Sequence, residues 1–234
     1  MKHLIQICIA AFKKNLVPGI FLQLFAILLV GSYYQVPGVA ESLESVVEIK
    51  LYGPYLFSAV TTMFFGGLMP LIIMHMMGRQ KYDHRLLVFT IVLWSWKGAE
   101  IEAFYELQGI IWGVGNAAHI ISKKVLFDQL VFSAFWAVPF TSLALLFRNV
   151  NYNVSRFKES INKTYFKEVI MPMLLGNWIL WFPACTFVYM MPGPLQTPLF
   201  SIILCFYVLM AEFITSGKER EQMELNESKV NQAN

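Results

Sequence analysis

Cysteine and charge are both scarce in this chain. Its 234 residues include three cysteines, Cys8, Cys185 and Cys205, which lie far apart inside apolar runs. An odd number of isolated cysteines excludes a disulfide framework and a Cys-x-x-Cys metal site, so we interpret them as small buried apolar residues. Charged residues make up only 14% of the chain, and the formal net charge is +3. Such a small charge, placed beside apolar runs, argues against a nucleic-acid-binding protein.

Motifs of catalysis and cofactor binding are missing as well. The sequence has no clear pair of nucleophile and base, no phosphate-binding loop and no cluster of metal ligands. The glycines between Gly109 and Gly115 follow a helical pattern and not a strand, which excludes a dinucleotide-binding loop. We therefore expect no catalytic residue, cofactor or metal, and an enzyme embedded in the membrane is the least favoured function.

Apolar residues are what the chain has in excess. At 57% hydrophobic residues, it has more apolar surface than one soluble core of this size needs, and the surplus predicts contact with lipid. The fold class that follows is all-α, an integral membrane bundle of about six transmembrane helices. The predicted spans are residues 16–34, 52–77, 86–112, 125–147, 169–191 and 195–215.

The remaining segments complete a single helical membrane domain, residues 1–217. Residues 148–168 alternate apolar and basic positions at helical spacing, which predicts an interfacial amphipathic helix. The segment 218–234 is a polar C-terminal tail. With both termini inside, 14 of the 18 lysine and arginine residues fall on one side, as the positive-inside rule requires.

Three places in the spans favour bends or close helix contacts. Gly66, Gly67 and Pro70 should kink the second span or let a neighbour approach. The third and fourth spans carry small-residue pairs at four-residue spacing and should be direct neighbours. These pairs are Gly109 with Gly113 and Ser133 with Ala137.

The third predicted span is unusual because it carries Lys97, Glu100, Glu102 and Glu106. If the helix continues to residue 112, Lys97 and Glu100 neutralise each other at i and i+3, and Glu102 and Glu106 need another partner or water. If the helix ends near Trp96, the same acids lie in a solvated loop. The sequence leaves both alternatives open.

A second polar group stands at the start of the fourth span. Lys124 and Asp128 are four residues apart, on one face of a helix and able to pair, with Gln129 beside them. Such a pair at a helix end is either a structural anchor or part of a polar interior.

Several of these residues also carry a family resemblance. Lys124-Val125-x-x-Asp128-Gln129, followed by Trp178-x-x-Trp181-x-Pro183-Ala184 and Pro194-Leu195-Gln196, resembles the Mpv-seventeen / peroxisomal membrane protein 22 family of multi-pass organelle membrane proteins. Gly115-x-x-x-His119 is similar to a further element of that family, and residues 54–61 are similar to its first span. The family is usually given four spans, which here would place two of the six segments in the interface.

The resemblance implies a pore or transporter for small solutes or ions. Its polar interior would be lined by Lys97, Glu100, Glu102, Lys124, Asp128 and Gln129. The family-like structural positions are Gly115, His119, Trp178, Trp181 and Pro183.

Two of these positions have other interpretations. His119 is either a pH-sensitive gate or a capping histidine, and the tryptophans are alternatively interface anchors.

The alternative function is a structural or assembly protein whose charges hold helices together without contacting a solute. The partners expected are the lipid bilayer, small solutes or ions and a second copy of the chain, with no nucleic acid. By resemblance the location is a peroxisomal or mitochondrial inner membrane, and a bacterial inner membrane is equally compatible with the sequence.

Overall fold

The computed structural model describes residues 2–78, 81 and 83–208, and side chains from residue 16 onward except those of residues 18 and 19. Every regular element in these ranges is a helix, so the predicted all-α class is confirmed there. The predicted tail, 218–234, and the end of the sixth predicted span lie outside the described residues.

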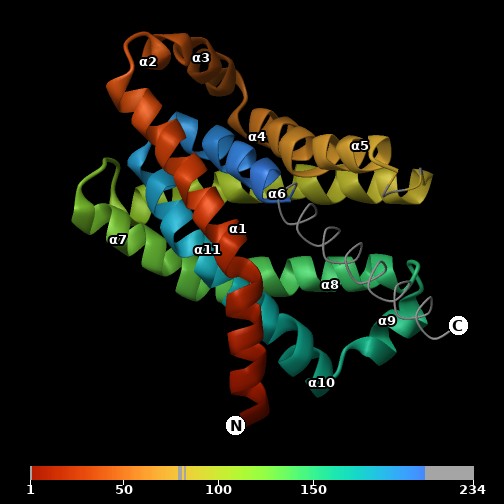
Figure 1. The fold of residues 1–234 in the computed structure, drawn as a ribbon. Coiled ribbons are helices and arrows are strands. Elements are labelled where there is room, and N and C mark those ends of the chain that lie inside the picture. The colour runs from red at the N-terminus through yellow and green to blue at the C-terminus, as the bar shows by residue number, and fades with distance from the viewer. Residues whose placement is uncertain (1, 79–80, 82, 209–234) are drawn as a thin grey trace, which may run out of the picture.

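In chain order (Figure 1) the helices are α1 (Lys2–Gln35), α2 (Val39–Ser42), α3 (Glu44–Tyr52), α4 (Pro54–Thr62), η1 (Met63–Leu68), α5 (Met69–Met76), α6 (His84–Trp112), α7 (Ala118–Phe127), η2 (Asp128–Ala137), α8 (Val138–Asn149), α9 (Val154–Ser160), α10 (Lys163–Tyr165), η3 (Phe166–Ile170), α11 (Met171–Met190) and a C-terminal helix, Gly193–Val208.

Three continuous helices are long and apolar enough to cross a membrane, and the number rises to four if a bent pair is counted as one span. The three are Pro54–Met76, Ala118–Asn149 and Lys163–Met190, and the bent pair joins Ile20–Gln35 to Val39–Tyr52 at an angle of 104°. The predicted count of six is therefore not supported. The third predicted span, α6, has the length but too many charges, and the C-terminal helix is short within the described residues.

Each of the three candidate spans contains a π-helical segment that ends just before a proline. The segments η1, η2 and η3 are followed by Pro70, Pro139 and Pro172, each at the start of the next α-helix. Proline lacks the N–H that an α-helix needs and its ring crowds the carbonyl four residues earlier, so a locally wider helix relieves the clash. The kink predicted at Gly66, Gly67 and Pro70 takes this form.

The two glycines in η1 let α6 approach closely. A Cβ added at Gly67 would lie 2.6 Å from the Trp94 ring, and one at Gly66 would lie 2.7 Å from Leu204 of the C-terminal helix. The predicted close approach is therefore present. In contrast, Gly113 has open space beside it and Gly109 meets only Val114 at 3.7 Å, so the predicted contact through this glycine pair is wrong.

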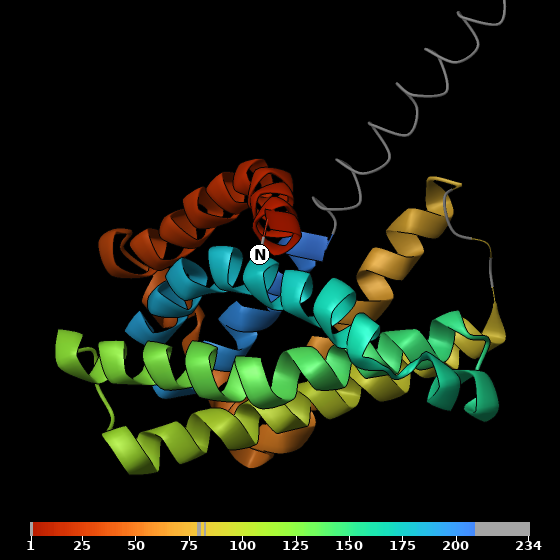
Figure 2. The ribbon, with the colours of Figure 1, turned by 90° about the horizontal axis from the view of Figure 1, so that it is seen from below.

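Helices α6 and α7–α8 nevertheless lie side by side and antiparallel (Figure 2). Aromatic rings and not small residues make their contact, because Phe104 stacks on Phe132 with ring centroids 3.9 Å apart and on Phe127 at 6.1 Å. Helix α1 runs parallel to α11, since Gln23 and Tyr34 donate hydrogen bonds to the carbonyls of Leu180 and Met190.

The segment 148–168 is not one amphipathic helix. Asn151 and Tyr152 both have φ of 59° and interrupt the chain after α8. The side chains of Asn153 and Asn162 then cap α9 and α10 by accepting from backbone N–H groups. Because α10 continues into η3 and α11, the fifth predicted span begins near residue 163 and not at residue 169.

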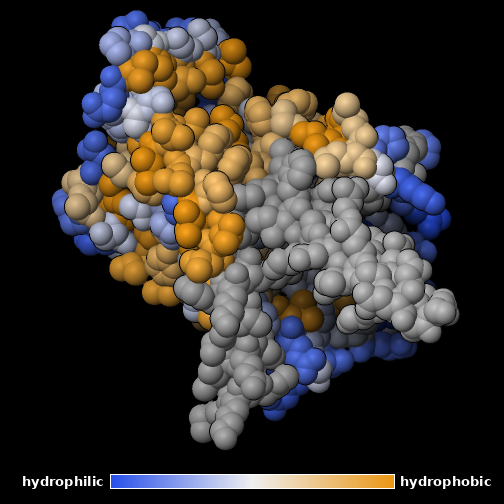
Figure 3. All heavy atoms as spheres, in the orientation of Figure 1, coloured by the Kyte–Doolittle hydropathy of each residue, from blue (hydrophilic) through white to orange (hydrophobic). Residues whose placement is uncertain are grey.

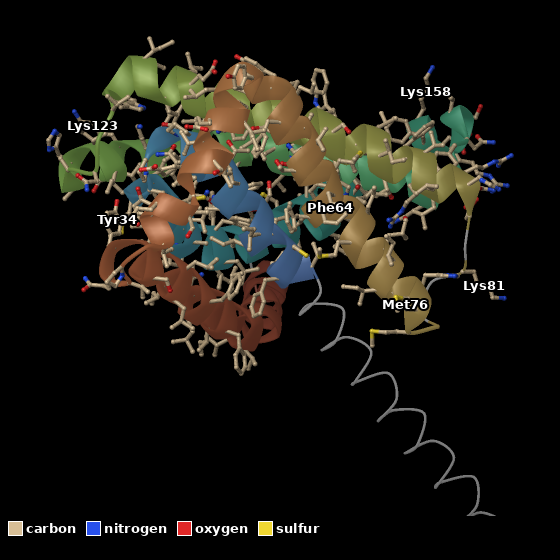
Figure 4. All side chains as sticks on the ribbon, turned by 90° about the horizontal axis from the view of Figure 1, so that it is seen from above. Tyr34, Phe64, Met76, Lys81, Lys123 and Lys158 are labelled. Carbon is tan, nitrogen blue, oxygen red and sulfur yellow. The ribbon has the colours of Figure 1, made fainter. Side chains whose placement is uncertain are left out.

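Apolar and polar side chains occupy different regions of the outer surface. Apolar side chains point outward along the helices, with Leu28, Leu56 and Phe135 exposed by 68, 72 and 79%. Figure 3 shows this apolar surface over α1 and α4–α5, with hydrophilic residues gathered at the edges. Lys81 and Lys158 lie at one end of the molecule and Lys123 at the other (Figure 4). A band of exposed apolar side chains between polar ends is the surface that lipid requires.

Candidate functional site

The charged residues of α6 lie inside the bundle. Lys97 and Glu102 are each 6% exposed, Glu100 is half-buried and Glu106 is exposed. The helix continues without a break to Trp112, so the alternative of a solvated loop after Trp96 is wrong. An ionised group buried in this way needs a partner of opposite charge or several hydrogen bonds.

Glu102 meets these needs in what we call the ion-pair network, formed by Lys50, Ser58, Glu102 and Thr197. The Lys50 ammonium lies 2.8 Å from Glu102 Oε2, and the hydroxyl groups of Ser58 and Thr197 donate to the same oxygen. These side chains come from α3, α4, α6 and the C-terminal helix, so one carboxylate joins four helices. A related contact, between the hydroxyl groups of Thr62 and Ser201 at 2.8 Å, links α4 to the C-terminal helix.

The crossing of α4 and α6 places Ser58 on Glu102. Gly98 is one turn before Glu102, and a Cβ at Gly98 would lie 2.1 Å from the Ser58 carbonyl oxygen. Only glycine lets the two backbones come this close. Lys50 reaches the network because α3 follows the bend after α1 at the end of the bundle, and its side chain is buried there.

Lys97 and Glu100 form the ion pair that their spacing predicts, with Nζ and Oε1 2.6 Å apart. The ammonium also lies 5.6 Å from the ring centroid of Phe140 and 5.9 Å from that of Phe132. Cation–π interactions of this kind stabilise a buried ammonium group.

A second cluster, the Asp128 network, joins α6, η2 and α11. Its centre is the Asp128 carboxylate, 5% exposed, which accepts hydrogen bonds from Tyr189 at 2.6 Å, Gln129 at 3.0 Å and Ser133 at 3.4 Å. Gln108 donates to the Tyr189 hydroxyl at 2.6 Å, so α6 is connected to the carboxylate through the tyrosine. All the donors that reach Asp128 are neutral groups.

The π-helical form of η2 explains part of this geometry. Asp128 and Ser133 are five residues apart, a separation that a π-helix but not an α-helix brings to the same face. Gln129, 1% exposed, also accepts from Asn177, and its carbonyl accepts from Trp178 at 2.7 Å. The wider helix therefore turns both polar side chains toward α11.

Lys124 and Asp128 do not pair, which corrects the prediction made from their spacing. Lys124 is 4% exposed, and its Nζ lies 5.9 Å from the ring centroid of Tyr189. The same tyrosine directs its hydroxyl at Asp128. Tyr189 thus contacts the lysine through its ring and the aspartate through its hydroxyl, although the backbone keeps α-helical spacing from Lys124 to Asp128.

The Asp128 network supports a test of stability. Tyr189→Phe removes the buried donor to Asp128 Oδ2 and leaves Gln108 Nε2 with the Lys124 carbonyl as its remaining acceptor, so we expect a loss of about 1–3 kcal/mol in the free energy of unfolding. Denaturation of the detergent-purified protein measures it. Tyr52→Phe is the control, because it removes the same hydroxyl group from a side chain that is 95% exposed. Equal stability of the two variants would contradict a role for the Tyr189 hydroxyl.

The family-like positions lie in different parts of the structure, and only some of them contact the Asp128 network. Gly115, with φ of 124°, and the exposed His119 lie at the turn between α6 and α7, and so apart from the Asp128 network. Trp178 and Trp181 are not simple interface anchors. Trp178 donates to Gln129, and Trp181 is 8% exposed with its ring 4.9 Å from that of Phe200.

Pro183 lies inside α11, where the missing N–H frees a carbonyl one turn earlier. Gln23 of α1 donates at 2.8 Å to the neighbouring carbonyl, that of Leu180. A polar side chain from the adjacent helix therefore supports the backbone at the proline, as expected for prolines in spans.

Several residues of the two networks were not predicted. For Lys50, Ser58 and Thr197 the sequence indicated only that each is a polar residue in or near an apolar segment, and it did not indicate that they contact Glu102. Gln108, Asn177 and Tyr189 are single polar groups in apolar runs, and a systematic search for such groups would have found the first two.

Metal ligands do not gather in the part of the chain that the structure describes. No group of three His, Cys, Asp or Glu side chains is placed to hold an ion there. Cys185 and Cys205 are free thiols and are buried, as predicted, and Cys8 lies outside the described side chains. Both networks are therefore built from ion pairs and hydrogen bonds among side chains.

Three apolar helices of spanning length, an apolar exterior and a polar interior define the class: this chain is an all-helical membrane protein over the residues described. No family model, curated protein or solved structure matches the chain.

Proposed function

We propose that the protein is a pore or transporter for small solutes or ions. The observation that carries this proposal is that charged and amide side chains of α6, α7 and η2 face the inside of a bundle whose outside is apolar. Lys97, Glu100, Glu102, Lys124, Asp128 and Gln129 contribute this polar interior. Ionisable groups inside a membrane bundle are costly, and substrate or ion pathways are where proteins retain them.

The buried charged groups differ in whether an ion-pair partner already balances their charge. Glu102 and Glu100 are each held by a lysine at 2.8 Å or less, so their charges are already balanced. Asp128 and Lys124 have no ion-pair partner in the described part of the chain. Paired charges give weak selectivity between cations and anions, whereas an unpaired acid favours cations. The Asp128 network is therefore the part of the interior that we assign to the conduit.

The membrane is an organelle or bacterial inner membrane in this proposal. The resemblance to the Mpv-seventeen / peroxisomal membrane protein 22 family supports a peroxisomal or mitochondrial inner membrane. Lys158, which lies at one end of the bundle with Lys81 (Figure 4), supports an orientation with that end inside.

The second candidate function is a structural or assembly protein. The ion-pair network favours it, because Lys50, Ser58 and Thr197 all direct their polar atoms at Glu102 and leave its contacting oxygen no room for a solute. Under this alternative the polar interior fixes the positions of helices and conducts nothing.

Planar bilayers distinguish the two functions. We expect the purified protein to conduct, and Asp128→Asn to move the reversal potential in a salt gradient toward anion permeability by roughly tenfold in the permeability ratio, since one contact of about 1.4 kcal/mol is removed. Glu106→Gln is the matched control, because Glu106 is an exposed acid on α6. An absence of conductance and of solute flux in proteoliposomes would leave only the structural function.

A further inference from the structure

Lys124 differs from the other buried lysines. Lys50 is held by Glu102 and Lys97 by Glu100, each through a direct ion pair. Lys124, only 4% exposed, has no ion pair or hydrogen bond through its ammonium among the residues that the structure describes. Its nearest charged neighbour along the helix, Asp128, is bonded to Tyr189, Gln129 and Ser133 instead.

Two more polar atoms without partners lie close to this lysine. Gln108 is fully buried, and its Nε2 donates to the Lys124 carbonyl at 3.2 Å, which brings the two residues together. Gln108 Oε1 is buried and accepts no hydrogen bond from the described residues. Trp112 Nε1, one turn further along α6, is a buried donor that is also unpaired there. One corner of the bundle therefore holds an unpaired cation, an unpaired donor and an unpaired acceptor.

The approach to this corner is basic. The chain from Leu107 to Phe127 contains no acidic residue. Lys123 and His119 are exposed at the turn between α6 and α7, and Figure 4 shows Lys123 at the outer edge of the molecule. Lys123 also lies 5.8 Å from the ring centroid of Trp112. The exposed Lys123 therefore adds a positive charge next to Lys124 in the chain, between the acids Glu106 and Asp128 that flank this stretch.

We propose that the corner formed by Lys124, Trp112 and Gln108 binds a small oxyanion, a carboxylate or a phosphate. The Lys124 ammonium and Trp112 Nε1 donate to its oxygens, and Gln108 Oε1 accepts from its hydroxyl group or from a bound water. Charge-assisted hydrogen bonds of this type are among the strong ones, and they remove the penalty of a buried ammonium without a counter-ion. The inference goes beyond the proposed function, whose preference for cations is assigned to Asp128, because it adds a binding site for anions at the end of the bundle where α6 meets α7.

Thermal unfolding in neutral detergent tests binding without any measurement of flux. Sodium acetate and sodium phosphate are compared with sodium chloride at equal ionic strength. We expect the oxyanions to raise the Tm of the wild-type protein by roughly 5 °C or more at about 100 times Kd. Lys124→Met should abolish this rise, and Lys123→Met, the same change at the adjacent exposed lysine, should retain it.

Lys124→Met is expected to fold, since replacing an unpaired buried charge by an apolar side chain of similar length is not destabilising. Lys124→Gln is a second variant, also expected to lose the rise. A rise that persists in both Lys124 variants, or no oxyanion-specific rise in the wild type, would overturn the assignment.

Lipid headgroups are the other source of phosphate oxygens. Phosphatidylglycerol added to the micelles, with phosphatidylcholine as its control, forms a separate arm of the same experiment. If only phosphatidylglycerol raises the Tm, the corner binds lipid and the solute assignment is wrong. If soluble oxyanions bind through Lys124 but bilayers show no conductance, the binding site stands and the proposed transport function fails.

Discussion

Replacing Gly98 by alanine should lower the free energy of unfolding by about 3 kcal/mol or more, the upper end of the range for overpacked sites. The added Cβ would lie 2.1 Å from the Ser58 carbonyl oxygen and 2.8 Å from the Ala59 Cα, so it meets backbone and not a flexible side chain. Helices α4 and α6 must separate to accommodate it. Because Ser58 then moves away from Glu102, the ion-pair network loses a donor as well.

Gly109→Ala is the matched control on the same helix. A Cβ there meets only Val114 at 3.7 Å, and alanine is favoured over glycine inside a helix by about 0.5–1 kcal/mol. Denaturant or thermal unfolding in one detergent compares the two variants. Similar stabilities for both would mean that the α4–α6 contact at Gly98 is looser than the structure has it.

Sequence spacing identified a glycine contact but at the wrong place. A pair of glycines four residues apart permits close approach, and Gly109 with Gly113 fits that pattern without a neighbour close enough to use it. Gly98 has no second glycine four residues away and does not match that pattern. The contact depends on where α4 crosses α6, which is a property of the folded bundle and not of either segment.

The polar interior was partly predictable for a physical reason. A charged side chain within an apolar helix must find a partner, so the pairing of Lys97 with Glu100 followed from their spacing once the helix continued past Trp96, whereas the sequence left open whether Lys97 and Glu102 are buried or solvated. The partner of Glu102 did not follow. Lys50 lies between the first two predicted spans, in a segment that also contains Glu41, Glu44 and Glu48, and the 104° bend before α3 brings it to the bundle.

Asp128 shows a different failure of spacing rules. The prediction of a Lys124 and Asp128 pair assumed 3.6 residues per turn. That spacing holds, because the Asp128 N–H bonds to the Lys124 carbonyl, but the carboxylate accepts from Ser133, five residues along the π-helix Asp128–Ala137, and from Tyr189 of α11. Pro139, two residues after the π-helix, was the signal available in the sequence, since prolines and wide turns occur together in all three candidate spans.

The number of spans exposes the limit of hydropathy. Apolar composition indicated six crossings, whereas three helices, or up to four segments, meet the requirements of length and apolarity in the described residues. Helix α6 fails because of its charges, yet those charges face its neighbours. Hydropathy averages over a segment and carries no information about which face of the helix each charge occupies.

Lys50→Met should lower the free energy of unfolding by about 3–5 kcal/mol, because it leaves the buried Glu102 carboxylate without a counter-ion. The double variant Lys50→Met with Glu102→Gln should recover much of that loss. The amide still accepts from Ser58 and Thr197, and no unpaired charge remains. Lys123→Met, at an exposed lysine, controls for the loss of one positive charge. Strictly additive effects of the two changes would contradict the ion pair.

The same double variant separates the two roles that a buried charge can have. If it is stable and conducts as the wild type does, the ion-pair network holds helices together and the solute path runs through the Asp128 network. If it is stable but no longer conducts, Glu102 itself contacts the solute, and its contacts with Ser58 and Thr197 must open during transport. A charge that serves only structure can be replaced in pairs without loss of flux, whereas a charge that contacts the solute cannot.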